Sequence, residues 1–171
     1  MKGKQYLLSP WSATPKRVVR KMLELAEIKP GETLYDLGCG DGRVLIEASK
    51  RYGIESVGIE CQEKWVRKSN ENVRTNGLEN LVTIVDGDIF DQDLSGADIV
   101  FTYLTNGGMN ILKDKLSAEL KDDARIVSHL STFKNVKPKS QHRVYDWQLW
   151  FPPRLPMPLY VALYEGKSLR V

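Results

Sequence analysis

Two patterns of apolar positions alternate along the chain. Val19, Met22, Leu23 and Ala26 recur at the three-to-four-residue spacing of a buried helix face. Elsewhere, short apolar runs end in glycine or acidic residues, which is typical of buried strands. The first pattern predicts one helix that begins after Thr14 and others at residues 43–52, 63–75 and 111–120. The second predicts strands at residues 33–37, 56–59, 81–85, 98–104, 125–130, 144–151 and 159–164.

Local signals mark the ends of several elements. Thr14 followed by Pro15 predicts an N-cap with proline at the first helical position, and residues 29–31 (Lys-Pro-Gly) predict the end of that helix. Gly53 predicts the C-terminal stop of the next helix. The last two strands flank the proline-rich segment 152–158, which we expect to join them as a rigid loop.

Strands that alternate with helices of this length predict right-handed crossovers and a parallel sheet. The fold class is therefore α/β, with a doubly wound, mostly parallel sheet. A length of 171 residues fits a single domain over residues 1–171. Residues 1–13, which include Tyr6 and Trp11, are too apolar for a solvated tail. We expect them to form an N-terminal flap over the ligand site.

Composition narrows the class of protein. Apolar residues make up 42% and charged residues 27%, which is ordinary for a soluble globular domain. A net charge of +3 is too mild to indicate a nucleic-acid binder by itself, although a pI near 8.8 keeps that option open. Cys39 and Cys61 have neither disulfide-scaffold nor metal-site spacing, so we expect reduced thiols and no metal. No signal peptide or membrane span is predicted, and we expect a cytoplasmic protein.

The strand at residues 33–37 enters a loop in which residues 36–42 read Asp-Leu-Gly-Cys-Gly-Asp-Gly. Glycines let a backbone turn tightly and approach a ligand closely, and the carboxyl ends of parallel strands are where such folds bind ligands. The spacing is G-x-G-x-G and not the G-x-G-x-x-G of dinucleotide sites. Asp36 and Asp41 flank the loop and would repel a pyrophosphate. They suit a ligand that carries an amine and a sulfonium.

Two further acidic residues follow neighbouring strands. Glu60 ends the second strand, where a carboxylate can accept hydrogen bonds from both ribose hydroxyls. Asp88 follows the third strand, at the same edge of the sheet. Together with the glycine loop, these residues predict an adenosine site without phosphate recognition. A structural turn, a solvated strand end and a plain turn residue are the alternatives for the glycines, Glu60 and Asp88 respectively.

Residues 36–42, Glu60 and residues 86–88 together resemble motifs I, II and III of the class I S-adenosylmethionine-dependent methyltransferases. The resemblance covers about the central half of the chain. It implies S-adenosyl-L-methionine as cofactor and a Rossmann-like, seven-stranded sheet that ends in an antiparallel hairpin. The site residues that it implies are Asp36, Gly38, Cys39 and Gly40 for the methionine part, Glu60 for the ribose, Asp88 and Ile89 for the adenine, with Thr102 as a further cofactor contact.

The methyl acceptor is less directly specified. After the fourth strand the chain lacks the D/N-P-P-Y/F motif of many enzymes that methylate base amino groups, so that class is disfavoured. Residues 14–23, 103–106 and 125–129 instead resemble the small archaeal-type protein lysine methyltransferases and their mitochondrial relatives. This resemblance runs from about residue 6 to about residue 131. It implies protein substrates with accessible lysines.

The same resemblance places Tyr103 and Asn106 in a catalytic role, lining a channel for the acceptor lysine. Tyr103 is equally consistent with strand-end packing, and Asn106 with capping of the next helix. We interpret His129, on a core strand, as a structural histidine with satisfied hydrogen bonds, with a catalytic role as the alternative. Trp11, Trp147 and Trp150 are interpreted as packing residues.

Three functions are consistent with these patterns. The first is protein lysine methylation, which the order of all the motifs favours. The second is methylation of RNA or of a small molecule, which the basic pI leaves open. The third is a nucleoside-binding module without catalysis.

Overall fold

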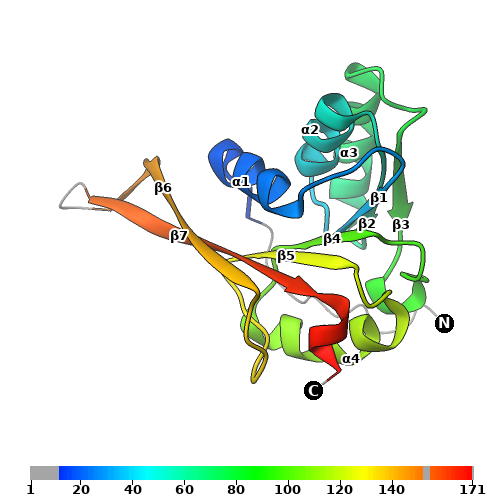
Figure 1. Cartoon of the computed structure of the whole chain (residues 1–171). Coiled ribbons are helices and arrows are strands. Elements are labelled where there is room, and N and C mark those ends of the chain that lie inside the picture. Colours follow the sequence, from blue (N-terminus) through cyan, green and yellow to red (C-terminus); the bar gives the residue numbers. More distant parts are fainter. Residues whose placement is uncertain (1–11, 152–154, 171) are drawn as a thin grey trace.

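The computed structural model, which describes residues 12–151 and 155–170, has a seven-stranded sheet in the order β3-β2-β1-β4-β5-β7-β6 (Figure 1). The first five strands are parallel, and β7 is antiparallel to both of its neighbours. The α/β class, the mostly parallel sheet and the C-terminal antiparallel hairpin are therefore confirmed. The strands are β1 (Thr33–Leu37), β2 (Glu55–Glu60), β3 (Val82–Asp86), β4 (Ile99–Thr102), β5 (Arg125–His129), β6 (Ser140–Phe151) and β7 (Leu155–Glu165).

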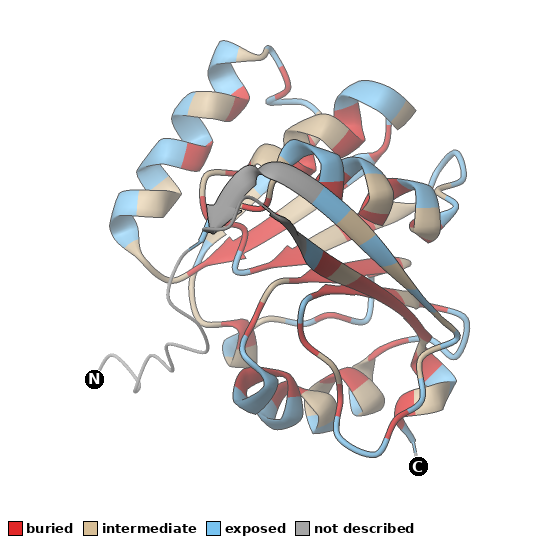
Figure 2. Cartoon of the chain, turned by 90° about the vertical axis from the view of Figure 1, so that its left-hand side faces the viewer, coloured by how far each residue is buried: buried red, intermediate tan, exposed pale blue. Residues whose placement is uncertain are grey.

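Helices cover both faces of the sheet because each has one apolar stripe to bury. One face of the sheet is covered by α1 (Lys16–Ala26), α2 (Arg43–Tyr52) and α3 (Glu63–Thr75), which share one apolar core with it. We call this the first face. The opposite face is covered by α4 (Asn106–Glu119), which shares a second apolar core with it. Short 3₁₀ turns, η1 (Ile89–Asp91) and η2 (Gly166–Leu169), complete the described elements. Figure 2 shows buried strands between helices whose outer sides are exposed. No helix in the described ranges is long and apolar enough to cross a membrane.

The predicted start and end of the first helix were wrong. Pro15, with an extended backbone, occupies the N-cap of α1, and Thr14 precedes it. The helix ends at Ala26 because Glu27 adopts the left-handed conformation, with φ at 47°, three residues before the proline that was expected to end it.

The predicted start of the fourth helix was also wrong. α4 begins at Asn106, five residues early, because the Thr105 hydroxyl accepts a hydrogen bond from the amide of Gly108 at 3.1 Å. The cap is therefore Thr105, and Asn106 is the first helical residue. Gly107 and Gly108 hid this first turn, since glycine is a poor helix former.

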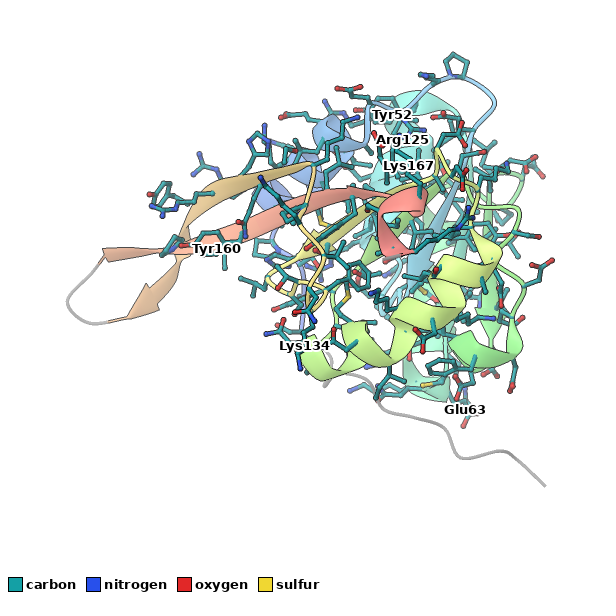
Figure 3. The ribbon with its side chains drawn as sticks, turned by 60° about the horizontal axis from the view of Figure 1, so that its bottom comes forward. Tyr52, Glu63, Arg125, Lys134, Tyr160 and Lys167 are labelled. Atoms are coloured by element: carbon teal, nitrogen blue, oxygen red, sulfur yellow. The ribbon has the colours of Figure 1, made fainter. Side chains whose placement is uncertain are left out.

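The C-terminal hairpin is longer than its predicted strands. The pairing of β5 with β7 ends at His129 and Val161, so residues 155–160 of β7 continue past the carboxyl end of β5. At about 3.3 Å per residue they form, with β6, an arm of roughly 20 Å. The arm projects at the left of Figure 1, and Tyr160 marks its base in Figure 3.

The proline-rich segment was predicted as a loop over residues 152–158. Residues 155–158 belong to β7 instead, and residues 152–154 lie outside the described part of the chain. Pro156 and Pro158 pair with Trp150 and Tyr145 of β6. They are tolerated in a strand because β6 is the only strand of the described ranges that pairs with β7 there.

Gly58 tests how closely the first face is packed. An added Cβ would lie 2.5 Å from Leu45 Cδ1 and 2.6 Å from Cys39 Sγ. We expect Gly58→Ala to lower the free energy of unfolding by about 1–3 kcal/mol in urea titrations, because both neighbours are buried. Gly107→Ala is the matched control: an added Cβ would have only Thr105 Oγ1 nearby, at 3.8 Å, and should leave stability unchanged or raise it by up to about 1 kcal/mol. Equal stability of Gly58→Ala and the unmodified protein would contradict this packing.

Candidate active site

A pocket opens at the carboxyl ends of β1, β2 and β4, where a parallel sheet binds its ligands. Every position that the sequence analysis assigned to the cofactor lines it. These positions are Asp36, Gly38, Cys39, Gly40, Glu60, Asp88, Ile89 and Thr102. Tyr103 also lines the pocket, whereas Asn106 does not. Within the described ranges, no group of three or more His, Cys, Asp or Glu side chains is placed to hold a metal ion.

Backbone amides of the glycine loop are occupied by hydrogen bonds to other backbone groups. Gly38, Gly40 and Gly42 have φ values of 84°, 55° and 76°, which favour glycine. The amides of Gly38 and Cys39 donate to the carbonyl of Ile59 on β2, at 2.9 and 3.1 Å. That of Gly42 donates to the Cys39 carbonyl. Amides committed in this way cannot cradle a phosphate, so the loop differs physically from a phosphate-binding loop.

Asp36 brings an uncompensated negative charge to the pocket. It ends β1 with only 6% of its surface exposed. Burial, with Glu60 and Asp41 nearby, raises the pKa of its carboxyl to about 7. A buried carboxylate with acidic neighbours is stabilised by a cation. The sulfonium and amine of S-adenosylmethionine therefore fit this wall of the pocket.

Asp41, by contrast, already has a cationic partner that the sequence analysis missed. Arg43 Nε lies 2.9 Å from Asp41 Oδ1, and Arg43 Nη2 lies 2.6 Å from Asp41 Oδ2, so the ion pair is bidentate. Asp41 still lines the pocket, but its charge is compensated by Arg43. The carboxyl of Asp36, with Glu60 beside it, has no such ion pair among the described residues. In the sequence, the ion pair of Asp41 could have been inferred from Arg43, which follows Asp41 by two residues.

Arg43 also connects the loop to the chain before α1. Its Nη1 donates to the carbonyl of Thr14 at 3.2 Å, and Ser12, Ala13 and Thr14 line the pocket. Most of the predicted flap, residues 1–11, lies outside the described residues. The flap stays a prediction, now with a described base beside the pocket.

Glu60 holds the glycine loop as well as facing the pocket. Its Oε2 accepts a hydrogen bond from the amide of Gly40 at 3.0 Å, and its Oε1 accepts one from the amide of Gln62 at 2.9 Å. The side chain is 5% exposed, so these bonds fix the carboxylate in place. Each oxygen retains a lone pair for a ribose hydroxyl.

The two remaining polar cofactor positions also make local contacts. Asp88 is the N-cap of η1, where its Oδ1 accepts from the amide of Phe90 at 3.0 Å. The buried hydroxyl of Thr102 donates to Met109 Sδ at 3.2 Å. Both side chains are therefore held in fixed positions beside the pocket.

The two predicted catalytic residues, Tyr103 and Asn106, do not lie at the same site. Tyr103 is half-buried at the end of β4, and its ring lies 4.2 Å from that of His129, centroid to centroid. Asn106 is exposed, and its Oδ1 accepts from the amide of Thr132 at 3.1 Å, which ties α4 to the chain after β5. Tyr103 thus lines the pocket, whereas Asn106 makes a tethering contact outside it.

Comparisons with known proteins agree with this geometry. Residues 36–140 match the model of the ANTKMT methyltransferase domain. A protein-lysine N-methyltransferase of Saccharolobus islandicus (strain REY15A) is 38% identical over 138 residues, which are 80% of this chain and 86% of that protein. The crystal structure of an RNA methyltransferase from Salinibacter ruber in complex with S-adenosyl-L-homocysteine is 33% identical, with a TM-score of 0.79, and the match covers 90% of this chain and 93% of that one.

A more distant structure is similar in fold alone. The C-terminal domain of precorrin-6Y C5,15-methyltransferase from Rhodobacter capsulatus has a TM-score of 0.73 at 21% identity, over 92% of this chain and 93% of that one.

The raised pKa of Asp36 predicts that cofactor binding depends on pH. A cation prefers the ionised carboxylate, so affinity should fall as the pH drops through about 7. Between pH 8 and pH 6 we expect S-adenosylmethionine to bind about tenfold more weakly by calorimetry. The stability of the free protein changes with pH in the opposite direction to cofactor affinity. A carboxyl whose pKa is raised on folding stabilises the free protein at low pH, and this contribution is lost as the pH rises from about 4 to about 7. Asp36→Asn is the control and should flatten the binding profile; an unchanged slope in that variant would assign the pH dependence elsewhere.

Glu60 gives a second prediction. Glu60→Ala removes the acceptor for the amides of Gly40 and Gln62 and a contact for the ribose. We expect it to weaken binding of S-adenosylhomocysteine by about 1–3 kcal/mol, measured by calorimetry. Glu63→Ala, an exposed acidic side chain at the start of α3, is the control and should bind normally. Normal affinity of Glu60→Ala would refute the ribose role.

The family assignment rests on more than one stretch of the chain. The matched residues include the glycine loop, Glu60, Asp88 and Tyr103, all of which line one pocket whose unbalanced acidic charge suits a sulfonium. The Saccharolobus relative extends the likeness over most of the chain. The chain therefore belongs to the family of the ANTKMT methyltransferase domain, and it is an S-adenosylmethionine-dependent methyltransferase.

Proposed function

We propose that this enzyme methylates lysine side chains of proteins. The observation that carries the proposal is the 38% identity to the Saccharolobus protein-lysine N-methyltransferase, over 86% of that protein. The chain after β4 also has Tyr103-Leu104-Thr105 and no proline pair. It thus departs from the motif of many enzymes that act on base amino groups.

The proposal assigns roles to the pocket residues. Asp36 and the loop at Gly38–Gly40 hold the methionine part of the cofactor, Glu60 the ribose, and Asp88 with Ile89 the adenine. When bound, S-adenosylmethionine supplies a methyl group already activated by its sulfonium. The protein therefore has mainly to align the acceptor and to favour its uncharged form.

Deprotonation of the acceptor is the step for which the protein's environment matters. A free lysine has a pKa of roughly 10.4, so its neutral amine costs about 4–5 kcal/mol at pH 7. A desolvating, partly aromatic surface disfavours the ammonium and lowers that cost. The half-buried ring of Tyr103 at the pocket supplies such a surface. It also suits a methylated ammonium product through cation–π attraction.

RNA methylation is the second candidate. The Salinibacter protein at 33% identity bears that name. Residues 126–164 carry five basic side chains and one acidic one, and Arg17 and Arg20 are exposed on α1. A basic surface attracts phosphates, but it also attracts acidic protein segments. Membership of a methyltransferase family disfavours the third possibility, a binding module without catalysis.

A labelled-methyl experiment separates the two acceptors. The enzyme is incubated with methyl-labelled S-adenosylmethionine and a cell lysate, and half of the sample is treated with nuclease. We expect label in protein that survives nuclease, and N-methyl-lysine after acid hydrolysis. Glu60→Ala, which should bind the cofactor poorly, is the control for background labelling. Label that disappears with nuclease would assign RNA as the acceptor and overturn the proposal.

A further inference from the structure

His129 is a buried polar residue that lacks hydrogen bonds. It ends β5 with 1% of its surface exposed, and neither ring nitrogen has a hydrogen-bond partner among the described residues. The expected structural histidine with satisfied hydrogen bonds is therefore not what the structure places here. Buried unsatisfied groups lower stability, and natural proteins keep few of them. Such a group at a strand end beside a pocket calls for a functional reason.

Tyr103 links His129 to the cofactor pocket, because it contacts the histidine and lines the pocket. β4 and β5 are paired through Thr102 and Ser128, so Tyr103 and His129 are the next neighbours at the carboxyl ends of the two strands. Their ring centroids are 4.2 Å apart with an interplanar angle of 45°. Tyr103 lines the pocket, and His129 does not. Tyr103 thus contacts His129 through its ring and also lines the ligand space.

The chain on both sides of this ring pair is held by hydrogen bonds. After β5, the Ser131 hydroxyl donates to the carbonyl of Leu104, and the Ser128 hydroxyl donates to the carbonyl of Ser131 at 2.6 Å. Backbone positions at the ends of β4 and β5 are therefore fixed relative to each other. A rotation of the Tyr103 side chain would therefore leave this backbone in place.

Leu130, directly after His129, is strained. Its φ is 63°, which is unfavourable for a residue with a side chain, and 39% of its surface is exposed. The amide of Leu130 donates to the carbonyl of Tyr160 at 2.8 Å, which keeps the turn in place. Strained backbone next to a buried unsatisfied ring is typical of functional sites. Neither feature is explained by stability, because both reduce it.

We propose that His129 belongs to the acceptor site: Tyr103 is its movable cover, and an imidazole nitrogen accepts a hydrogen bond from the acceptor amine once the tyrosine ring moves aside. This inference rests on the proposed lysine methylation. It assigns to His129 a contact with substrate and to Tyr103 control over that contact.

The chemistry of a desolvated imidazole suits this task. Burial lowers the pKa of His129 to about 4, so the ring stays neutral and does not repel the amine. It is too weak a base to take the ammonium proton, which passes to water before transfer. One N–H of the neutral amine then donates to His129, and the nitrogen lone pair points at the methyl carbon. That lone pair forms the new N–C bond, and the electrons of the broken S–C bond stay on sulfur.

His129→Phe tests the contact because it keeps a ring and removes both nitrogens. We expect methyl transfer to nuclease-treated lysate protein to fall about tenfold, with unchanged affinity for S-adenosylhomocysteine. The melting temperature should rise by about 2–4 °C, since buried unsatisfied atoms are removed. Tyr164→Phe removes a hydroxyl buried in the opposite core and is the control that should transfer methyl groups normally.

Tyr103→Ala tests the cover by a readout other than activity. Uncovering His129 should raise its pKa toward 6.5 in an NMR titration, because solvent then reaches the ring. The chain has two histidines, and His142 on β6 serves as the internal reference. An unchanged His129 pKa in this variant would show that Tyr103 is not the cover.

The two proposals fail in different ways. If unmodified enzyme labels RNA and not protein, the proposed function is overturned, and the comparison of His129→Phe with unmodified enzyme is then made on RNA. If His129→Phe transfers methyl groups at the unmodified rate to whichever acceptor is labelled, the inference about His129 is overturned and lysine methylation is untouched. A lower rate together with a lower melting temperature would assign His129 a structural role only, and would also overturn it.

Discussion

The glycine loop depends on the carboxylate of Glu60. Three glycines in the left-handed conformation make this stretch of chain intrinsically mobile, so its shape must be imposed from outside. β2 does this through two acceptors, the carbonyl of Ile59 and the side chain of Glu60, which engage the amides of Gly38, Cys39 and Gly40. The same carboxylate faces the ligand, so the shape of the loop and recognition of the cofactor share one group. Because β1 and β2 are neighbours in the sheet, both acceptors lie within reach of the loop.

Charge then decides which ligand the loop can take. The amides of Gly38, Cys39 and Gly40 are hydrogen-bonded to β2, and Arg43 compensates the charge of Asp41. What remains is the buried carboxyl of Asp36, supported by no described cation and opposed by Glu60. A phosphate would meet neither donors nor positive charge there, whereas a sulfonium meets an anion. Specificity for the cofactor thus comes from an electrostatic imbalance that the fold maintains and the ligand relieves.

The sequence predicted the cofactor half of the molecule better than the acceptor half. The bounds of β1, α2 and α3 matched because each has a clear apolar period and a glycine or polar stop. All cofactor positions came together because strand ends of a parallel sheet meet at one edge. The first turn of α4 was missed because its two glycines carry no helical signal. Thr105 could not be recognised as the cap, since the cap is identified only once the start of the helix is known.

The Arg43 ion pair and the stacking of Tyr103 on His129 could not be read from periodicity. Both depend on rotamers and on the register between strands distant in sequence. The chain alone likewise gave no reason to expect an unsatisfied histidine, since burial of polar groups normally comes with partners.

The arm formed by β6 and β7 has one further consequence. Among the described residues, residues 155–160 of β7 have no neighbour on the side where β5 pairs with residues 161–165. This leaves an open strand edge of the kind that recruits further strands. The carbonyl of Tyr160 faces that side, since it accepts from Leu130, and alternate residues face the same way. Those residues are Pro158 and Pro156, which have no amide hydrogen. The open edge therefore lacks two of the donors that a growing sheet requires, which disfavours the addition of a further strand along this part of the arm.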